Sequence, residues 1–343
     1  MSELEKNLQP DVVISSRVRL ARNYKDVPFS SVMNHDWAEK TIDYAAQAVI
    51  AAGQDQNFQM LRMEGLSADE RNRLVEHHLI SYDLLKFSGL SAALISKDKT
   101  LSIMVNEEDH LRIQGLLPGM QLIRAAEIAF DADSMLSGNH EYAFDAQWGY
   151  LTSCPTNTGT GMRASTMLHL PALSAARQMG AVMQAVSRLG LTVRGLYGEG
   201  SDALGNLYQL SNQVTLGKTE EDMIRSLIAA TRQLADHELA VREKLIERNP
   251  VEREDKIMRS VGIMSQARVM PLSEFMQYMS DMRLAVCSGY MQAELQAIDQ
   301  MTMDLQPASI RVRCGSELTD AECDQVRAEL LRDQIGRMLD NEK

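Results

Sequence analysis

Hydrophobic and polar positions in the first two thirds of the chain alternate between the two-residue period of strands and the longer period of helices. Strands are predicted over residues 12–20, 58–63, 144–152, 191–196 and 207–216, with a hairpin over 92–105 that turns at 97–99. Helices are predicted over 36–52, 67–87, 120–130 and 172–189, the second opening on a capping box of Ser67 and Glu70. Because adjacent strands are joined by short turns, the pattern favours an α+β fold with a mostly antiparallel sheet flanked by helices.

From Thr219 onward the pattern is almost entirely helical. Thr219 precedes a run of acids, which is typical of a helix N-cap, and this helix is predicted to run to Asn249 and Pro250. Further helices are predicted over 252–265, 273–286 and 320–339. A chain of 343 residues is long enough for two domains, and we expect a mixed domain over 1–240 and an all-helical C-terminal domain over 241–343.

Composition and charge exclude several classes of function. The formal net charge of −12 argues against a nucleic-acid binder, and no polybasic segment would anchor the chain to an anionic membrane. The N-terminus has no apolar signal core, and no stretch approaches the ~18 apolar residues of a membrane span. The four cysteines form no CxxC pair, so neither a metal site nor a disulfide framework is predicted. We therefore expect a cytoplasmic protein without a membrane or nucleic-acid partner.

Arginine outnumbers lysine 25 to 10, and arginine is the residue suited to a bidentate grip on phosphates. Arg17 and Arg19 alternate by two, so both project from one face of the predicted strand. Arg112, Arg163 and Arg194 lie beside loops rich in glycine, asparagine or acids. If these loops converge, five cations face a polyanion, for which ATP with Mg²⁺ is the obvious candidate. Neither a Walker motif nor the protein-kinase motifs occur, and any single arginine could instead form a surface ion pair.

Two acids and one cysteine lie in segments suited to chemistry. Glu108 belongs to the run Asn-Glu-Glu-Asp-His, which is either part of a site or an exposed acidic turn. Glu199 lies between two glycines, and two such carboxylates could hold a guanidinium and take its proton, since the guanidinium pKa exceeds ~12. Cys154 would favour the thiolate in an arginine-lined cleft, or it is a small buried hydrophobe. It precedes Gly159 and Gly161, which suit either an anion site before a helix or a tight turn.

Four segments together resemble one known family. They are SSRVRLARN from Ser15, NEEDHLR from Asn106, CPTNTGTGMRAS from Cys154 and RGLYGEGSDALGNLYQLSNQ from Arg194. In the same order they are similar to the conserved blocks of the phosphagen (guanidino) kinases. Only 14 residues precede Ser15, and about 100 helical residues follow the blocks, as in the bacterial branch of the family that phosphorylates arginine residues of proteins.

The resemblance implies an ATP site and a set of catalytic groups. Glu108 matches the catalytic glutamate, Glu199 the second acid with Asp202 as the alternative, and Cys154 the reactive cysteine beside the guanidinium. With Mg²⁺, ATP would be bound by Ser15, Ser16, Arg17, Val18, Arg19, His78, Arg112, Arg163, Ala164, Ser165, Thr166, Met167, Arg194, Gly195, Leu196, Tyr197, Gly198 and Glu199. The expected reaction transfers the γ-phosphoryl group to arginine residues of proteins. The alternatives are a kinase of free arginine or another small guanidine, and a catalytically silent adaptor.

The resemblance also implies regulation and partners. Relatives carry an RDxxRA motif that binds phosphoarginine allosterically, and the matching segment here replaces the first arginine with Cys323 and keeps Asp324, Arg327 and Ala328. Asp324 and Arg327 share one helical face, so a structural ion pair is the other interpretation. Relatives form homodimers and higher oligomers, work with a zinc-binding activator protein, and mark clients for the ClpC–ClpP protease in the stress response and protein quality control.

Overall fold

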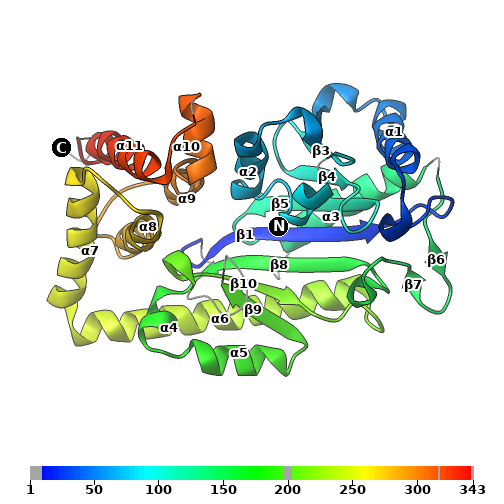
Figure 1. Cartoon of the computed structure of the whole chain (residues 1–343). Helices are drawn as coiled ribbons and strands as arrows, with labels where there is room; N and C mark the ends of the chain where they lie inside the picture. Colours follow the sequence, from blue (N-terminus) through cyan, green and yellow to red (C-terminus); the bar gives the residue numbers. More distant parts are fainter. Residues whose placement is uncertain (1–9, 88, 139, 196–202, 316, 341–343) are drawn as a thin grey trace.

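The computed structural model describes residues 10–87, 89–138, 140–195, 203–315 and 317–340 (Figure 1). Its centre is an eight-stranded sheet in the order β2-β3-β4-β5-β1-β8-β10-β9, with every neighbouring pair antiparallel. A separate two-stranded ribbon is formed by β6 (Phe144–Asp145) and β7 (Gly149–Tyr150). The strands of the large sheet are β1 (Val13–Arg22), β2 (Phe58–Arg62), β3 (Ala92–Ser96), β4 (Leu101–Val105), β5 (Leu111–Pro118), β8 (Met162–His169), β9 (Leu191–Gly195) and β10 (Leu207–Asn212).

One face of the sheet is apolar and covered by helices. Alternate strand residues such as Val18, Leu20 and Ile113 are fully buried there. On the same face, the hydroxyl oxygens of Thr166 and Thr231 lie 3.0 Å apart. The α+β class with an antiparallel sheet flanked by helices is confirmed. The covering helices are α1 (His35–Ala51), α3 (Leu122–Ser137), α4 (Pro171–Ala175), α5 (Met179–Ser187) and α6 (Glu220–Arg248).

On the opposite face a smaller apolar cluster covers the β2-β3-β4 side, where α2 (Ala68–Glu76) and the segment after it pack Leu79, Ile80 and Leu84 against Met104. The C-terminal part packs on the end of β8, where His169 Nε2 lies 2.8 Å from the Ser280 hydroxyl. The centre of this face carries polar and charged side chains, which the next subsection describes.

After α6 the described chain contains helices and no strand. Figure 1 shows α7 leaving the end of α6 at a sharp angle; Asn249 separates the two helices and Pro250 begins α7. The second core is rich in methionine and includes Met264, Met279 and Met282. In the part of the chain that the structure describes, no helix is long and apolar enough to cross a membrane. The helices are α7 (Pro250–Gln266), α8 (Leu272–Cys287), α9 (Leu295–Asp304), α10 (Pro307–Cys314) and α11 (Asp320–Asp340).

The helix predicted over 67–87 is wrong beyond Glu76. Its capping box is confirmed, because the Ser67 hydroxyl accepts from the Glu70 amide at 3.2 Å and the Glu70 carboxylate accepts from the Ser67 amide at 2.7 Å. The helix ends because His78 adopts a left-handed backbone with φ of 58°, which interrupts the helical hydrogen bonds. A 3₁₀ turn over Asp83–Phe87 follows.

Other element predictions also need correction. The strand over 144–152 divides into β6 and β7, because the Asp145 carboxylate accepts from the amides of Gln147 and Trp148 and stabilises a turn. The helix over 172–189 divides into α4 and α5 at Arg177, whose φ is 57°. The loop with Gly159 leads into a strand, β8, and not into a helix. The elements β5, α9 and α10 were not predicted.

Glu76 joins the sheet domain to the C-terminal helices. Its carboxylate accepts hydrogen bonds from the amides of Ala308 and Ser309, each at 2.8 Å, and from the Ser309 hydroxyl at 2.7 Å. These amides belong to the first turn of α10, so a residue from the end of α2 caps a helix 232 positions away in sequence. Burial raises the pKa of Glu76, and the hydrogen bonds from Ser309 and Ala308 lower it.

Glu76→Ala is expected to lower the free energy of unfolding by about 1–3 kcal/mol, because two helix amides and a hydroxyl lose their acceptor. Urea denaturation followed by circular dichroism measures the change. Glu64→Ala, which removes an exposed carboxylate from a nearby turn, is the control and should change stability by less than about 0.5 kcal/mol. Equal effects of the two substitutions would contradict the capping role.

Candidate active site

Strand register brings the five predicted arginines to one face of the sheet, here called the arginine face. Arg19 of β1 lies directly opposite Arg163 of β8, and residues directly opposite in an antiparallel pair share a face. Arg112 of β5 lies opposite Ala21 of β1, two positions beyond Arg19. Arg194 of β9 lies opposite Gln209 of β10, which pairs with Met167 of β8. The predicted convergence of these arginines therefore follows from hydrogen-bond register as well as from loops.

Because successive side chains of a strand point to opposite faces of the sheet, the predicted nucleotide-binding residues divide between the two faces. Ser16, Val18, Ala164 and Thr166 point to the helix-covered face and are buried there. The Ser16 hydroxyl, for example, donates to the carbonyl of Gly119 at 2.8 Å. Only the backbone of these four residues could contribute to a site on the arginine face. The side chains that share that face are Ser15, Arg17, Arg19, Arg163, Ser165 and Met167.

The arginine face concentrates positive charge, which Glu107 and Glu108 oppose at Arg112. Burial, followed by the charges of Arg112 and Arg163, lowers the pKa of Arg17 to about 10. Burial and the neighbouring arginines Arg17, Arg112 and Arg163 also lower the pKa of Arg19, against the opposing effect of Glu107. Among the described residues, the buried Nε atoms of Arg19 and Arg163 have no hydrogen-bond partner. Buried cations with free donors favour an anion, so this face fits the phosphates of a nucleotide.

His78 lies at the edge of this face, although it is not on the predicted helix. A small pocket brings its ring together with Arg17, Ser165 and Gln209. Burial, Arg17 and His77 lower the pKa of His78 to about 4, so its ring is neutral near pH 7. The Gln209 side chain accepts a hydrogen bond from Arg17 at 2.5 Å. The structure thus places His78 beside Ser15, Arg17, Ser165 and Met167.

The run Asn106–His110 is mainly scaffold. Asp109 accepts from the Asn23 side chain and from the Ser153 amide, each at 2.7 Å. His110 Nδ1 accepts from the Tyr24 amide at 3.0 Å, which leaves its Nε2 hydrogen for the Pro28 carbonyl at 2.8 Å. Burial of these groups shows that the run is not an exposed acidic turn.

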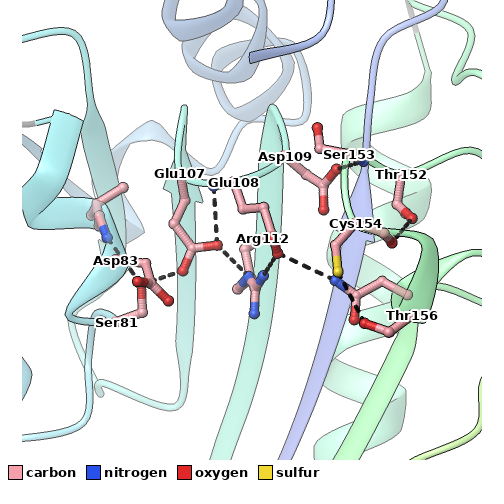
Figure 2. Close-up of polar contacts among 12 residues, drawn as sticks. Ser81, Asp83, Glu107, Glu108, Asp109, Arg112, Thr152, Ser153, Cys154 and Thr156 are labelled. Carbon is pink, nitrogen blue, oxygen red and sulfur yellow. Dashed lines mark hydrogen bonds and ion pairs between the residues drawn. The ribbon is translucent and has the colours of Figure 1, made fainter. Parts of the chain in front are cut away.

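Glu108 is the one carboxylate of this run that is open to solvent, with 43% of its side chain exposed. Its Oε2 lies 3.2 Å from Arg112 Nη2 and 3.4 Å from the side-chain nitrogen Nδ2 of Asn157. The neighbouring Glu107 is fully buried and holds Arg112 Nε at 2.5 Å, while Ser81 donates to its other oxygen. Figure 2 shows this line of contacts from Ser81 across Arg112 to the loop of Cys154. Burial raises the pKa of Glu108, and Arg112 opposes that shift.

Cys154 lies at the start of a tightly bonded loop beside Glu108. Its Sγ is 3.0 Å from the Thr156 hydroxyl, and it is only partly buried, so it is not a core hydrophobe. The Cys154 thiolate would raise the pKa of Arg163 by charge interaction, so the thiol lies near the arginine face. Hydrogen bonds fix the start of the loop, including one from the Ser153 amide to the Asp109 carboxylate.

The glycines after Cys154 serve the protein's own packing. Gly159 has φ of 112°, and a Cβ there would lie 2.4 Å from the carbonyl oxygen of Thr215. Gly161 has φ of 64°, and its Cβ would lie 2.7 Å from the carbonyl oxygen of Ala21. The close approach is therefore between backbone segments, and the interpretation of these glycines as an anion site before a helix is wrong.

Two positioning residues were missed by sequence reasoning, and five predicted residues lie outside the part of the chain that the structure describes. Glu107 holds Arg112 and Asp109 holds the cysteine loop, yet in sequence both look like the polar neighbours of Glu108. Their only signal was that so many acids directly follow a buried strand. The predicted residues Leu196, Tyr197, Gly198 and Glu199, and the alternative acid Asp202, lie outside the described residues.

In the C-terminal helices, Arg327 is fully buried and bonded to the protein itself. Its guanidinium donates to the carbonyls of Leu305 at 2.8 Å and Met270 at 2.6 Å, and to Asp324 at 2.5 Å. Ala328 is fully buried in the second core. The geometry favours the structural interpretation of this ion pair, although one buried Nη2 of Arg327 has no partner among the described residues.

Comparison with known proteins agrees with this geometry. The model of the ATP:guanido phosphotransferase C-terminal catalytic domain matches residues 40–241, and that of the protein-arginine kinase McsB C-terminal domain matches residues 250–343. A protein-arginine kinase of Desulforamulus reducens is 47% identical over 333 residues, 96% of this chain and 93% of the relative. One of Caldanaerobacter subterraneus is 44% identical over 95% of this chain and 98% of the relative.

Solved structures share the fold of the catalytic part. A lombricine kinase structure has a TM-score of 0.60 at 24% identity and covers 70% of each chain. A duplicated taurocyamine kinase from Schistosoma mansoni, with bound transition state analog components, has a TM-score of 0.61 at 26% identity over 70% of this chain and 34% of that chain. The resemblance seen in the four sequence blocks is confirmed, and the chain belongs to the ATP:guanido phosphotransferase family.

Proposed function

We propose that this protein is a protein-arginine kinase, which transfers the γ-phosphoryl group of ATP to arginine side chains of other proteins. The observation that carries the proposal is a partly exposed carboxylate, Glu108, held 3.2 Å from Arg112 at the edge of the arginine face. A carboxylate next to a phosphate-binding surface is what a guanidinium acceptor requires. Relatives named protein-arginine kinase match nearly the whole chain, including the C-terminal helices.

The nucleotide would bind along the arginine face. Its phosphates would neutralise Arg17, Arg19, Arg112, Arg163 and Arg194, whose crowding is otherwise unfavourable. Ser15, His78, Ser165, Met167 and Gly195 would complete the site. Mg²⁺ would bind together with ATP through the phosphate oxygens. It would retain several water ligands, because Mg²⁺ is usually bound by substrate phosphates and only one or two carboxylates. When bound, it would help to neutralise the transferring group.

Glu108 would act on the acceptor. It would orient the guanidinium and remove one proton, so that a guanidinium nitrogen attacks the γ-phosphorus while the bond to the β,γ-bridging oxygen breaks. The products are ADP and a phosphorylated arginine, and the proton remains on Glu108 until it passes to solvent. Cys154 would lie beside the guanidinium, and Glu199, or alternatively Asp202, would supply the second acid.

The acceptor is tested by supplying ATP and Mg²⁺ with either an unfolded casein-like protein or free arginine. We expect an acid-labile phosphoramidate on protein arginines, detected by ³¹P NMR and by mass spectrometry under non-acidic handling, and little phosphorylation of free arginine. Preferential phosphorylation of free arginine would favour the small-guanidine kinase. ATP binding without transfer to either acceptor would favour the silent adaptor.

We further propose the broader properties that accompany such a kinase. These are a catalytic unit over 1–240 and a helical unit over 241–343, homodimers or higher oligomers, a cytoplasmic location, and a role in the stress response. A zinc-binding activator and the ClpC–ClpP protease are the proposed partners, with degradation of the marked clients. Phosphoarginine binding at Asp324, Arg327 and Ala328 would require Arg327 to exchange internal contacts for the ligand.

A further inference from the structure

A cavity of about 270 Å³ lies between the two halves of the chain. Its walls come from α4 and α6 of the sheet domain and from α7 and α8 of the helical part. Figure 1 shows α4 and α6 below the sheet, α7 rising from the end of α6, and α8 beside α7 at the end of the sheet. α4 and α6 cover the apolar face of the sheet, and the side chains of Arg17, Arg19 and Arg163 project from the opposite face.

The central residue of the cavity wall is Arg242 of α6, whose side chain is only 7% exposed. Its Nη2 lies 3.3 Å from Glu238, but that carboxylate is already shared with the amides of Ala172 and Leu173, each at 2.9 Å. Among the described residues, Arg242 Nε and Nη1 make no hydrogen bond to nitrogen or oxygen. The nearby thiol of Cys287 is a weak acceptor, and burial raises its pKa, so it stays neutral. Apart from a contact with this thiol, the buried Nε and Nη1 donors of Arg242 have no partner among the described residues.

Two further cations line the same cavity. Arg253 and Lys256 lie one turn apart on α7, and the guanidinium of Arg253 makes no hydrogen bond or ion pair with the described residues. The one carboxylate in the lining, Asp281, accepts from the Ser260 hydroxyl at 2.8 Å and lies 3.9 Å from Lys256 Nζ. With Glu238 beside Arg242, the three cations exceed the two nearby carboxylates by one charge. A phosphomonoester carries a charge of about −1.5 to −2 near pH 7 and three acceptor oxygens, so it can accept hydrogen bonds from more than one of these cations at once.

The remainder of the lining is apolar. Leu245 and Ile246 of α6, Ile257 of α7 and Leu284 of α8 line the cavity. An inorganic phosphate would contact the cations and leave this surface unused. We propose that the cavity binds a small organic phosphate, with its phosphoryl group at Arg242 and Arg253 and its carbon body against these apolar side chains. Such a ligand would contact both halves of the chain at once.

Isothermal titration calorimetry on the full chain tests the site, with saturating Mg²⁺ and a non-hydrolysable ATP analogue to occupy the arginine face. Phenyl phosphate is the probe, and inorganic phosphate is the comparison. We expect saturable binding of phenyl phosphate that Arg253→Ala weakens by about tenfold or more, the loss of one charge-assisted hydrogen bond. Arg253 is partly exposed, so this variant is expected to fold. Arg188→Ala, which removes an exposed arginine beyond α5, should leave the affinity unchanged.

Three results would overturn the proposal. They are no saturable binding of phenyl phosphate by the wild-type chain, equal affinity of the Arg253→Ala variant, and affinity for inorganic phosphate equal to that for phenyl phosphate. Because the measurement records binding with the ATP site filled, its failure leaves the proposed kinase activity unaffected. Arginine phosphorylation can likewise fail while this site still binds its ligand.

Discussion

Replacement of Glu108 by glutamine is expected to slow phosphoryl transfer by about 10²–10⁴-fold, the usual contribution of a positioned general base. Glutamine keeps the size of the side chain and an oxygen that can accept from Arg112, which lies 3.2 Å from the carboxylate in the wild-type chain. ATP affinity should therefore change little. Initial rates of arginine phosphorylation, together with titration of a fluorescent ATP analogue, separate the two effects.

The pH dependence of the rate gives a second test of the same residue. A base must be ionised to act, and burial raises the pKa of Glu108, so the rate should rise with pH over a range above that of an ordinary glutamate. Glu108→Gln should remove this rising limb. Glu127→Gln, which removes an exposed carboxylate of α3 paired with Arg124, is the matched control and should keep both rate and profile. A normal rate in Glu108→Gln would exclude Glu108 as the base.

Much of the site was predictable because its elements have strong local signals. The alternation of Arg17 and Arg19 placed both on one face of a strand, and register adds Arg163 directly opposite Arg19. The hairpin of β3 and β4 and the Thr219 cap were equally local, and the Thr219 hydroxyl does accept from the Asp222 amide at 3.1 Å. Local periodicity determines which face a side chain occupies, so these predictions required no knowledge of distant contacts.

What the sequence did not reveal depends on contacts between distant segments. Gly159 must lack a Cβ because the carbonyl of Thr215 lies against it, and Glu76 accepts hydrogen bonds from the amides of α10. Both partners are distant in sequence. The helix that ends at Glu76 was predicted too long, because the apolar residues Leu79 and Ile80 continue the helical pattern of the sequence but pack as a turn after His78. Tertiary packing there outweighs a local preference that is worth a few tenths of a kcal/mol per residue.

Asp133→Ala is expected to lower the free energy of unfolding by about 3–5 kcal/mol, because it leaves the guanidinium of Arg22 buried without its counter-charge. Arg22 is 1% exposed, and its Nε and Nη2 donate to Asp133 at distances of 2.9–3.1 Å. The same guanidinium donates from Nη1 to the carbonyl of Thr160 at 3.0 Å and lies 3.5 Å from the ring centroid of Tyr150. The ion pair therefore connects α3 and β1 to the loop that follows Cys154.

A double substitution distinguishes loss of the pair from loss of packing. Arg22→Met with Asp133→Leu removes both charges and retains apolar volume, so urea denaturation should show it to be more stable than Asp133→Ala alone. It nevertheless loses the donor to Thr160, so the loop after Cys154 should exchange its amide hydrogens faster in hydrogen–deuterium exchange. If the double variant were as unstable as Asp133→Ala, packing would account for the cost. Restored stability together with faster exchange in the loop would show that the buried charge of Arg22 is not needed for stability. Its role would then be to hold the loop after Cys154 in position.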